Sequence, residues 1–211
     1  MCIRDRPKRP PQRQEPHTVK LHHTLPSLLL ILSSCGVLQP VKDQAVHHVL
    51  DPLVVERYLT SSVPTIAIKR PSIPGYLDRQ QLVTRKGDEL VLSELDLWAE
   101  SLDVAISRVT ATNLSHLTGS MNIRPVENFT TLDYPTLLEL DITQFDPGGT
   151  NTLILKGTWK LQPVNGKPIP AHFFRIELPI PSTTDSSAGR IIAMNRALES
   201  LARQIVANKH P

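Results

Sequence analysis

Residues 98–117 carry the most regular apolar pattern in the chain. Their apolar side chains follow the helical period and fall on one face of a helix, and these side chains are Trp98, Leu102, Ala105, Ile106, Val109 and Leu117. Asp96 precedes the pattern as a candidate N-cap, and Gly119 follows it as a candidate C-terminal stop. The sequence therefore predicts a long helix over residues 98–117 with one buried face.

A second helix is predicted over residues 187–208, near the end of the sequence. Its apolar residues repeat every three or four positions, at Ile191, Met194, Leu198, Leu201 and Ile205. Ser186 or Ser187 is a candidate cap.

Runs of alternating or β-branched residues predict strands at residues 47–50, 65–69, 81–85, 89–92, 137–145, 152–161 and 171–179. Turn residues separate several of them, at Lys86–Asp88, residues 146–149 and Asn165–Gly166. This succession of strands, helix, strands and helix predicts an α/β fold. We expect a single domain with a mixed, largely antiparallel sheet and two main helices packed on it.

The charge of the chain is concentrated at its start. The 211 residues have a net charge of +3, but the first twenty residues hold six basic and two acidic side chains. The remaining chain therefore has 17 basic and 18 acidic residues and a net charge of −1. A nucleic-acid-binding function, which usually requires a basic domain, is not supported.

The first 34 residues divide into two expected segments. Residues 1–18 begin with MCIRDR, which resembles a translated sequencing-library adapter, and we interpret them as a non-native or untranslated leader outside the fold. Residues 19–34 contain the basic Lys20 and an apolar run over Leu25–Leu32. That run is too short to span a bilayer and is typical of a signal peptide.

Cys35 is the predicted site of lipid attachment. The preceding Leu32, Ser33 and Ser34 resemble a bacterial lipobox, after which a cysteine is acylated and becomes the first mature residue. The only other cysteine is Cys2, so the exported chain cannot form an internal disulfide. An ordinary signal peptide with a chance cysteine is the alternative. We expect residues 35–64 to be a tether and residues 65–211 to form the domain.

No catalytic or metal-binding pattern is visible. The chain has no HExxH, GxSxG or phosphate-loop sequence. His47 and His48 are adjacent, so on a strand they point to opposite faces and make a poor metal pair. Asp141 and Asp146 are interpreted as solvated carboxylates. We expect no enzyme activity, no metal and no cofactor, apart from covalent acyl chains on Cys35.

Three side chains are candidates for a partner or oligomer interface. Tyr76 and Leu77 follow Pro74–Gly75, so we expect them on a loop, either as interface anchors or folded back onto the core. Trp98 lies on the apolar stripe of the predicted helix, which favours core packing over partner contact.

Several of these segments together resemble the ABC-type transport auxiliary lipoprotein (PqiC-like) family. The resemblance rests on residues 73–85 (IPGYLDRQQLVTR), on residues 97–102 (LWAESL), and on residues 138–145 followed by Gly157-Thr158-Trp159. It spans roughly residues 28–207, including the lipobox and both predicted helices. One departure is Ser101, where many members carry a proline.

The resemblance implies a non-enzymatic periplasmic lipoprotein. Family members accompany MCE-domain proteins and inner-membrane permease components that move lipids between two membranes. The expected location is the periplasmic face of the bacterial outer membrane, and Gly36 after the acylated cysteine agrees with that destination. Assembly into a homo-oligomeric ring is also expected. The alternative is an envelope lipoprotein that activates or scaffolds a cell-wall synthase.

Overall fold

The computed structural model describes residues 43–52, 65–126, 134–147, 151–183 and 186–208. The described residues from Gln44 onward belong to one compact unit. The elements are β1 (Val46–His48), β2 (Ile66–Lys69), β3 (Gln81–Lys86), β4 (Glu89–Trp98), α2 (Leu102–Thr118), β5 (Ile123–Val126), β6 (Thr136–Pro147), β7 (Thr152–Pro163), β8 (His172–Pro179) and α3 (Ser186–Ala207).

The larger of the two sheets has five strands in the order β5-β2-β6-β7-β8. The strands β5, β2 and β6 are mutually parallel, whereas β6, β7 and β8 form an antiparallel meander. Leu138, Leu140 and Ile142 alternate along β6 and are buried, because successive side chains of a strand point to opposite faces. This alternation is the reason that β6 was recognisable in the sequence.

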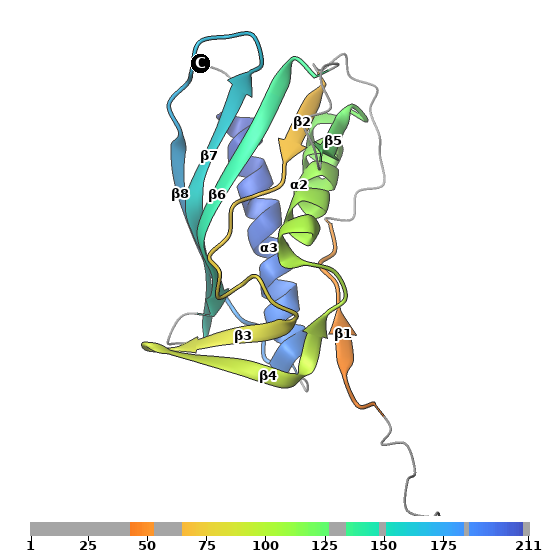
Figure 1. Cartoon of the computed structure of the whole chain (residues 1–211), viewed down its shortest axis with the longest axis vertical. Coiled ribbons are helices and arrows are strands. Elements are labelled where there is room, and N and C mark those ends of the chain that lie inside the picture. Colours follow the sequence, from red (N-terminus) through yellow and green to blue (C-terminus); the bar gives the residue numbers. More distant parts are fainter. Residues whose placement is uncertain (1–42, 53–64, 127–133, 148–150, 184–185, 209–211) are drawn as a thin grey trace, which may run out of the picture. The chain divides into compact units, whose positions relative to one another are not determined.

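The smaller sheet has three strands in the order β1-β4-β3. The strands β3 and β4 form the predicted hairpin, and Gly87 at its turn has a φ of 63° that favours glycine. The strand β4 extends to Trp98 and pairs in parallel with β1. In Figure 1 the hairpin lies at the lower end of the drawing, below the main length of the five-stranded sheet.

Both predicted helices are present, and each packs against the other and against the core. Their buried side chains join the inner face of the five-stranded sheet in one apolar cluster, which includes Ile106, Leu114, Leu138, Leu198 and Leu201. Figure 1 shows both helices running alongside this sheet. The predicted α/β class, with two helices on a mixed arrangement of strands, is confirmed, and the strands divide into two sheets.

The predicted start of the first helix is wrong. The helix α2 begins at Leu102 with Ser101 as its N-cap, and Asp96 lies within β4. Trp98 remains in the strand because its N–H donates to the Gln80 carbonyl at 2.6 Å and it lies opposite His48 of β1. The four-residue spacing between Trp98 and Leu102 therefore imitates a helical repeat. The predicted C-terminal stop is confirmed, because Gly119 has a φ of 67°.

Three further details differ from the sequence predictions. The short β5 was missed, since its four residues IRPV include a proline. The strands β7 and β8 are joined by residues 164–171, a longer connection than the Asn165–Gly166 pair suggested. Of the predicted turn over residues 146–149, Asp146 and Pro147 belong to β6, and residues 148–149 lie outside the described residues.

Candidate functional site

The segment over residues 73–85 contains the first two interface candidates. A turn follows Pro74, whose carbonyl accepts a hydrogen bond from the Leu77 N–H at 2.9 Å. This turn directs Leu77 inward, where it is only 3% exposed. Tyr76 is half-buried and packs against the edge of the same core. The loop placement predicted for both residues is correct, and Leu77 folds back onto the core.

Trp98 points into the same part of the interior as Leu77. Both residues, with Leu102 and Met194, line a small apolar space between β4, α2 and α3. Trp98 is 6% exposed. Packing within the domain therefore accounts for Leu77 and Trp98, and their role in a partner interface stays a prediction.

Tyr76 belongs to a polar cluster built around the carboxylate of Asp146. The Tyr76 hydroxyl donates to Asp146 Oδ2, Arg85 Nε donates to Asp146 Oδ1 at 3.3 Å, and Gln144 Nε2 donates to the same oxygen at 3.0 Å. The Asp146 side chain is completely buried. The earlier interpretation of Asp146 as a solvated carboxylate is therefore wrong, whereas Asp141 on the outer face of β6 is exposed.

The electrostatics of this cluster keep Tyr76 protonated. Burial is the largest cause, and the hydrogen bond to the Asp146 carboxylate adds to it, so that the pKa of Tyr76 is raised to about 12. The Arg85 guanidinium lies 5.1 Å from the centre of the Tyr76 ring, within cation–π range. The cluster thus connects the loop after β2, the strand β3 and the end of β6, with Asp146 satisfied by three donors.

The sequence did not reveal this cluster, although two of its members lie in the recognised segment 73–85. Tyr76 and Arg85 are separated from Asp146 by 70 and 61 positions. Only the packing of the smaller sheet and its preceding loop against the end of β6 brings such distant residues together. The one local sign of a buried Asp146 is that this residue directly follows Phe145, the last apolar residue of the predicted strand.

Residues 46–51 are fixed against the domain by several polar contacts. His48 Nε2 lies 2.8 Å from Asp96 Oδ1, and Arg108 Nη2 donates to the Leu50 carbonyl at 2.9 Å. The Asp51 N–H donates to Asn195 Oδ1 of α3 at 3.1 Å. Burial acts to raise the pKa of Asp96, but hydrogen bonds from His48 and other donors outweigh it, and the pKa is lowered. The chain thus enters the domain along β4.

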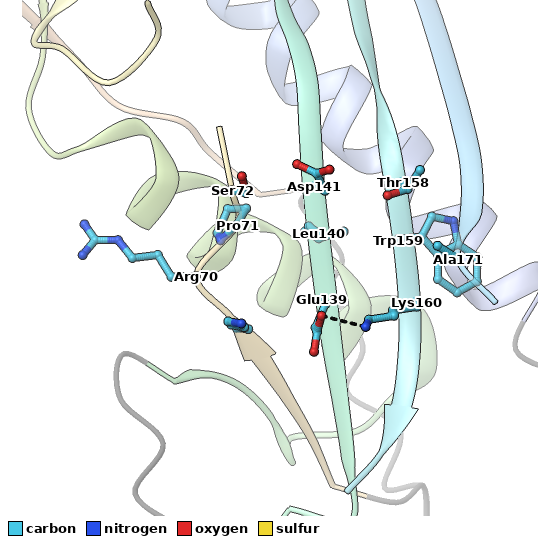
Figure 2. A pocket seen from close by; sticks show the side chains of 11 residues that line it. Arg70, Pro71, Ser72, Glu139, Leu140, Asp141, Thr158, Trp159, Lys160 and Ala171 are labelled. Atoms are coloured by element: carbon cyan, nitrogen blue, oxygen red, sulfur yellow. Dashed lines mark ion pairs between the residues drawn. The ribbon is translucent and has the colours of Figure 1, made fainter. Parts of the chain in front are cut away.

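An open groove of about 460 Å³ lies against β6 and β7, where the chain that follows β2 separates from β6. Ile68 of β2 pairs with Leu138 of β6, and the next residue that pairs with β6 is Ser72, opposite Asp141. The residues between Ile68 and Ser72 do not pair with β6. Figure 2 shows Glu139 and Lys160 directed toward one another, at 3.0 Å, and Arg70 directed away from β6. Arg70 instead pairs with Asp103 at 2.5 Å. Arg70, Glu139 and Lys160 of the groove are therefore paired within the domain.

Among the described residues there is no cluster of three or more His, Cys, Asp or Glu side chains that could hold a metal ion. Within the same residues, no helix is long and apolar enough to cross a membrane. His47 is exposed and His48 half-buried, and they lie on one short strand. Cys35 and the lipobox residues Leu32, Ser33 and Ser34 lie outside the described residues.

Comparison with family models gives a match over most of the domain. The model described as the ABC-type transport auxiliary lipoprotein component matches residues 49–206. This range includes residues 73–85, all strands from β2 onward, α2, and α3 except its last residue. No curated protein matches the chain.

Solved structures share the fold. A crystal structure of an uncharacterised protein has 18% identity and a TM-score of 0.63, and the match covers 79% of this chain and 99% of that one. A Xanthomonas campestris protein of the DUF330 family has 15% identity and a TM-score of 0.61, with 77% and 93% covered. The PelC dodecamer from Paraburkholderia phytofirmans has 12% identity over 66% and 91%, and its TM-score of 0.39 is too low to indicate a common fold.

Proposed function

The chain belongs to the family of ABC-type transport auxiliary lipoprotein components, and from this we propose that it is the lipid-anchored subunit of an MCE-type intermembrane lipid transport system. In this proposal, acyl chains on Cys35 hold it at the periplasmic face of the outer membrane. The observation that carries the proposal is the family match over residues 49–206, preceded by a lipobox cysteine at residue 35.

The order of segments fits an anchored subunit. Acyl chains contribute about 0.8 kcal/mol per buried CH₂, so several chains on one cysteine give a stable anchor. Residues 36–45 of the expected tether lead to β1, which pairs with β4 and is joined to it by the contact between His48 and Asp96. In this proposal the segment between Cys35 and β1 joins the membrane anchor to the domain, and its β1 end is fixed to β4.

The proposed partners are an MCE-domain protein and the inner-membrane permease components of the same transporter. The family description supports a role as an auxiliary part of a transporter. Assembly of several copies into a ring is part of the proposal. We also propose that the protein performs no catalysis. The buried carboxylate of Asp146 is occupied by hydrogen bonds from Tyr76, Arg85 and Gln144 of the same domain.

The anchor is tested by substituting Cys35 and, separately, a residue of the lipobox. We expect Cys35→Ala to abolish incorporation of labelled palmitate and to release the protein from the membrane fraction, because the thiol that carries the lipid is lost. The control is Ser33→Ala, which keeps a small side chain in the lipobox and should leave both measurements unchanged. Retention of Cys35→Ala in the outer-membrane fraction would refute the lipid anchor.

The partner is tested by crosslinking the acylated protein in its envelope and identifying what is recovered. Recovery of an MCE-domain protein supports the transport role. Recovery of a cell-wall synthase in its place would support the scaffold alternative. The neighbouring genes provide an independent check, since adjacent MCE and permease genes are expected only for the transport role.

A further inference from the structure

Exposed aliphatic side chains are concentrated on one strand of the three-stranded sheet. Leu90, Val91 and Leu92 of β4 are each 40% exposed, and Leu95 is 50% exposed. We call these four residues the hairpin patch. Contiguous exposed apolar side chains of this kind usually mark a surface that a protein partner or a membrane covers.

The hairpin patch has apolar side chains on both faces of a narrow ribbon. Leu90, Val91 and Leu92 are consecutive and lie opposite Arg85, Thr84 and Val83 of β3. Neighbouring side chains on a strand point to opposite faces, so neither face of this hairpin is purely polar. Charges of both signs flank the patch, with Lys86 on one side of the turn and Asp88 and Glu89 on the other.

The tether enters the domain on the same sheet. Val46 of β1 lies opposite Asp96, directly beside Leu95, and Val46 is itself 51% exposed. Ten residues lie between Cys35 and Val46, and a fully extended chain over these eleven steps spans at most about 40 Å. The whole hairpin patch lies within about 20 Å of that entry point along β4.

We propose that the hairpin patch rests on the lipid surface that holds the acyl chains of Cys35, so that the domain contacts the membrane at a second place. This inference rests on the proposed lipid anchor. The chain from Cys35 enters the domain beside β4, whereas Figure 1 places the β7–β8 connection at the opposite end of the five-stranded sheet, so the hairpin patch lies nearer to that entry point.

A lipid surface fits the chemistry of the hairpin patch better than a second copy of the chain. The boundary between headgroups and acyl chains is fluid and surrounds a thin hairpin, so it covers aliphatic side chains on both faces. A rigid protein partner typically covers one face. The flanking Lys86, Asp88 and Glu89 remain at the headgroup level, where charged ends of amphipathic elements commonly lie.

The test uses the mature acylated protein in vesicles of phosphatidylethanolamine and phosphatidylglycerol. Leu92→Cys provides a labelling site for a polarity-sensitive fluorophore, since Cys35 is acylated. Ile169→Cys is the matched control, because Ile169 is 43% exposed and lies in the β7–β8 connection. We expect the emission of the Leu92→Cys label to shift to the blue and to be quenched by nitroxide lipids, with neither effect at Ile169→Cys.

Three results would overturn the inference. Equal emission and equal quenching at the two positions would show that the hairpin does not contact lipid. A blue shift that grows with protein density and is not quenched by nitroxide lipids would assign the hairpin patch to a second copy. Mass spectrometry that finds Cys35 unacylated would refute the proposed anchor itself, and with it this inference. Circular dichroism melting verifies that each variant is folded.

Discussion

Asp146 is the residue at which the two sheets and the intervening loop are joined. Its buried carboxylate accepts hydrogen bonds from Tyr76 of the loop, Arg85 of β3 and Gln144 of its own strand. A buried charge is tolerated only when it is paired and hydrogen-bonded, which these donors achieve. Residues 73–85 therefore contribute to cohesion of the domain through Tyr76 and Arg85.

We expect Asp146→Ala to lower the free energy of unfolding by about 2–4 kcal/mol, because Tyr76 and Arg85 lose their shared acceptor. Urea denaturation followed by circular dichroism measures this change. Asp141→Ala is the control, since Asp141 lies on the exposed face of the same strand, and it should alter stability by less than about 0.5 kcal/mol. Equal effects of the two substitutions would show that the cluster contributes nothing.

The raised pKa of Tyr76 predicts a loss of stability at high pH. The folded protein retains a proton that the unfolded chain releases above the ordinary value of 10.0, so the contribution is complete below pH 10 and lost as the pH rises toward 12. Ultraviolet titration of tyrosinate should show one step near pH 12. Tyr76→Phe should remove that step, and Tyr134→Phe should leave it unchanged.

At the scale of elements, the β6–β7 pair depends on a glycine. A Cβ atom added at Gly157 would lie 2.1 Å from the carbonyl oxygen of Asp141, at the place where the register shifts between Ile142 and Gln144. Backbone atoms on a paired strand cannot move aside without breaking the ladder. The close approach of these two strands therefore requires glycine at this position.

We expect Gly157→Ala to destabilise the protein by about 1–3 kcal/mol or more, because β6 and β7 must separate to accommodate the methyl group. Thermal melting of the purified variant measures the loss. Gly75→Ala is the matched control, since nothing lies within 4 Å of its added Cβ, and it should leave the melting temperature nearly unchanged. An unchanged Gly157→Ala variant would contradict the close approach.

The elements also show where periodicity succeeds and where it misleads. Long strands such as β6 and β7 were predicted because their inner residues alternate over many positions. The boundary between β4 and α2 was misplaced because Trp98 fits both a strand end and a helical stripe. Pairing with β1 decides that position, and β1 lies about fifty residues earlier in the sequence.

At the scale of the whole molecule, residues Gln44–Pro211 form a compact unit with its own apolar core. We expect a chain limited to these residues to fold without lipid, and to melt within about 2 °C of the mature acylated protein in detergent. Differential scanning calorimetry measures both transitions. A much lower melting temperature for the shorter chain would show that the preceding residues contribute to the folded state.

The α/β class, the two helices, the longer strands and the family could be predicted from the sequence, because these depend on local periodicity and on contiguous motifs. The division into two sheets, the burial of Leu77 and Trp98, and the cluster around Asp146 became visible only in the folded structure. The folded structure also placed the exposed hairpin patch on the sheet where the tether enters. These features depend on contacts between residues far apart in the chain, and no local pattern encodes which strand pairs with which.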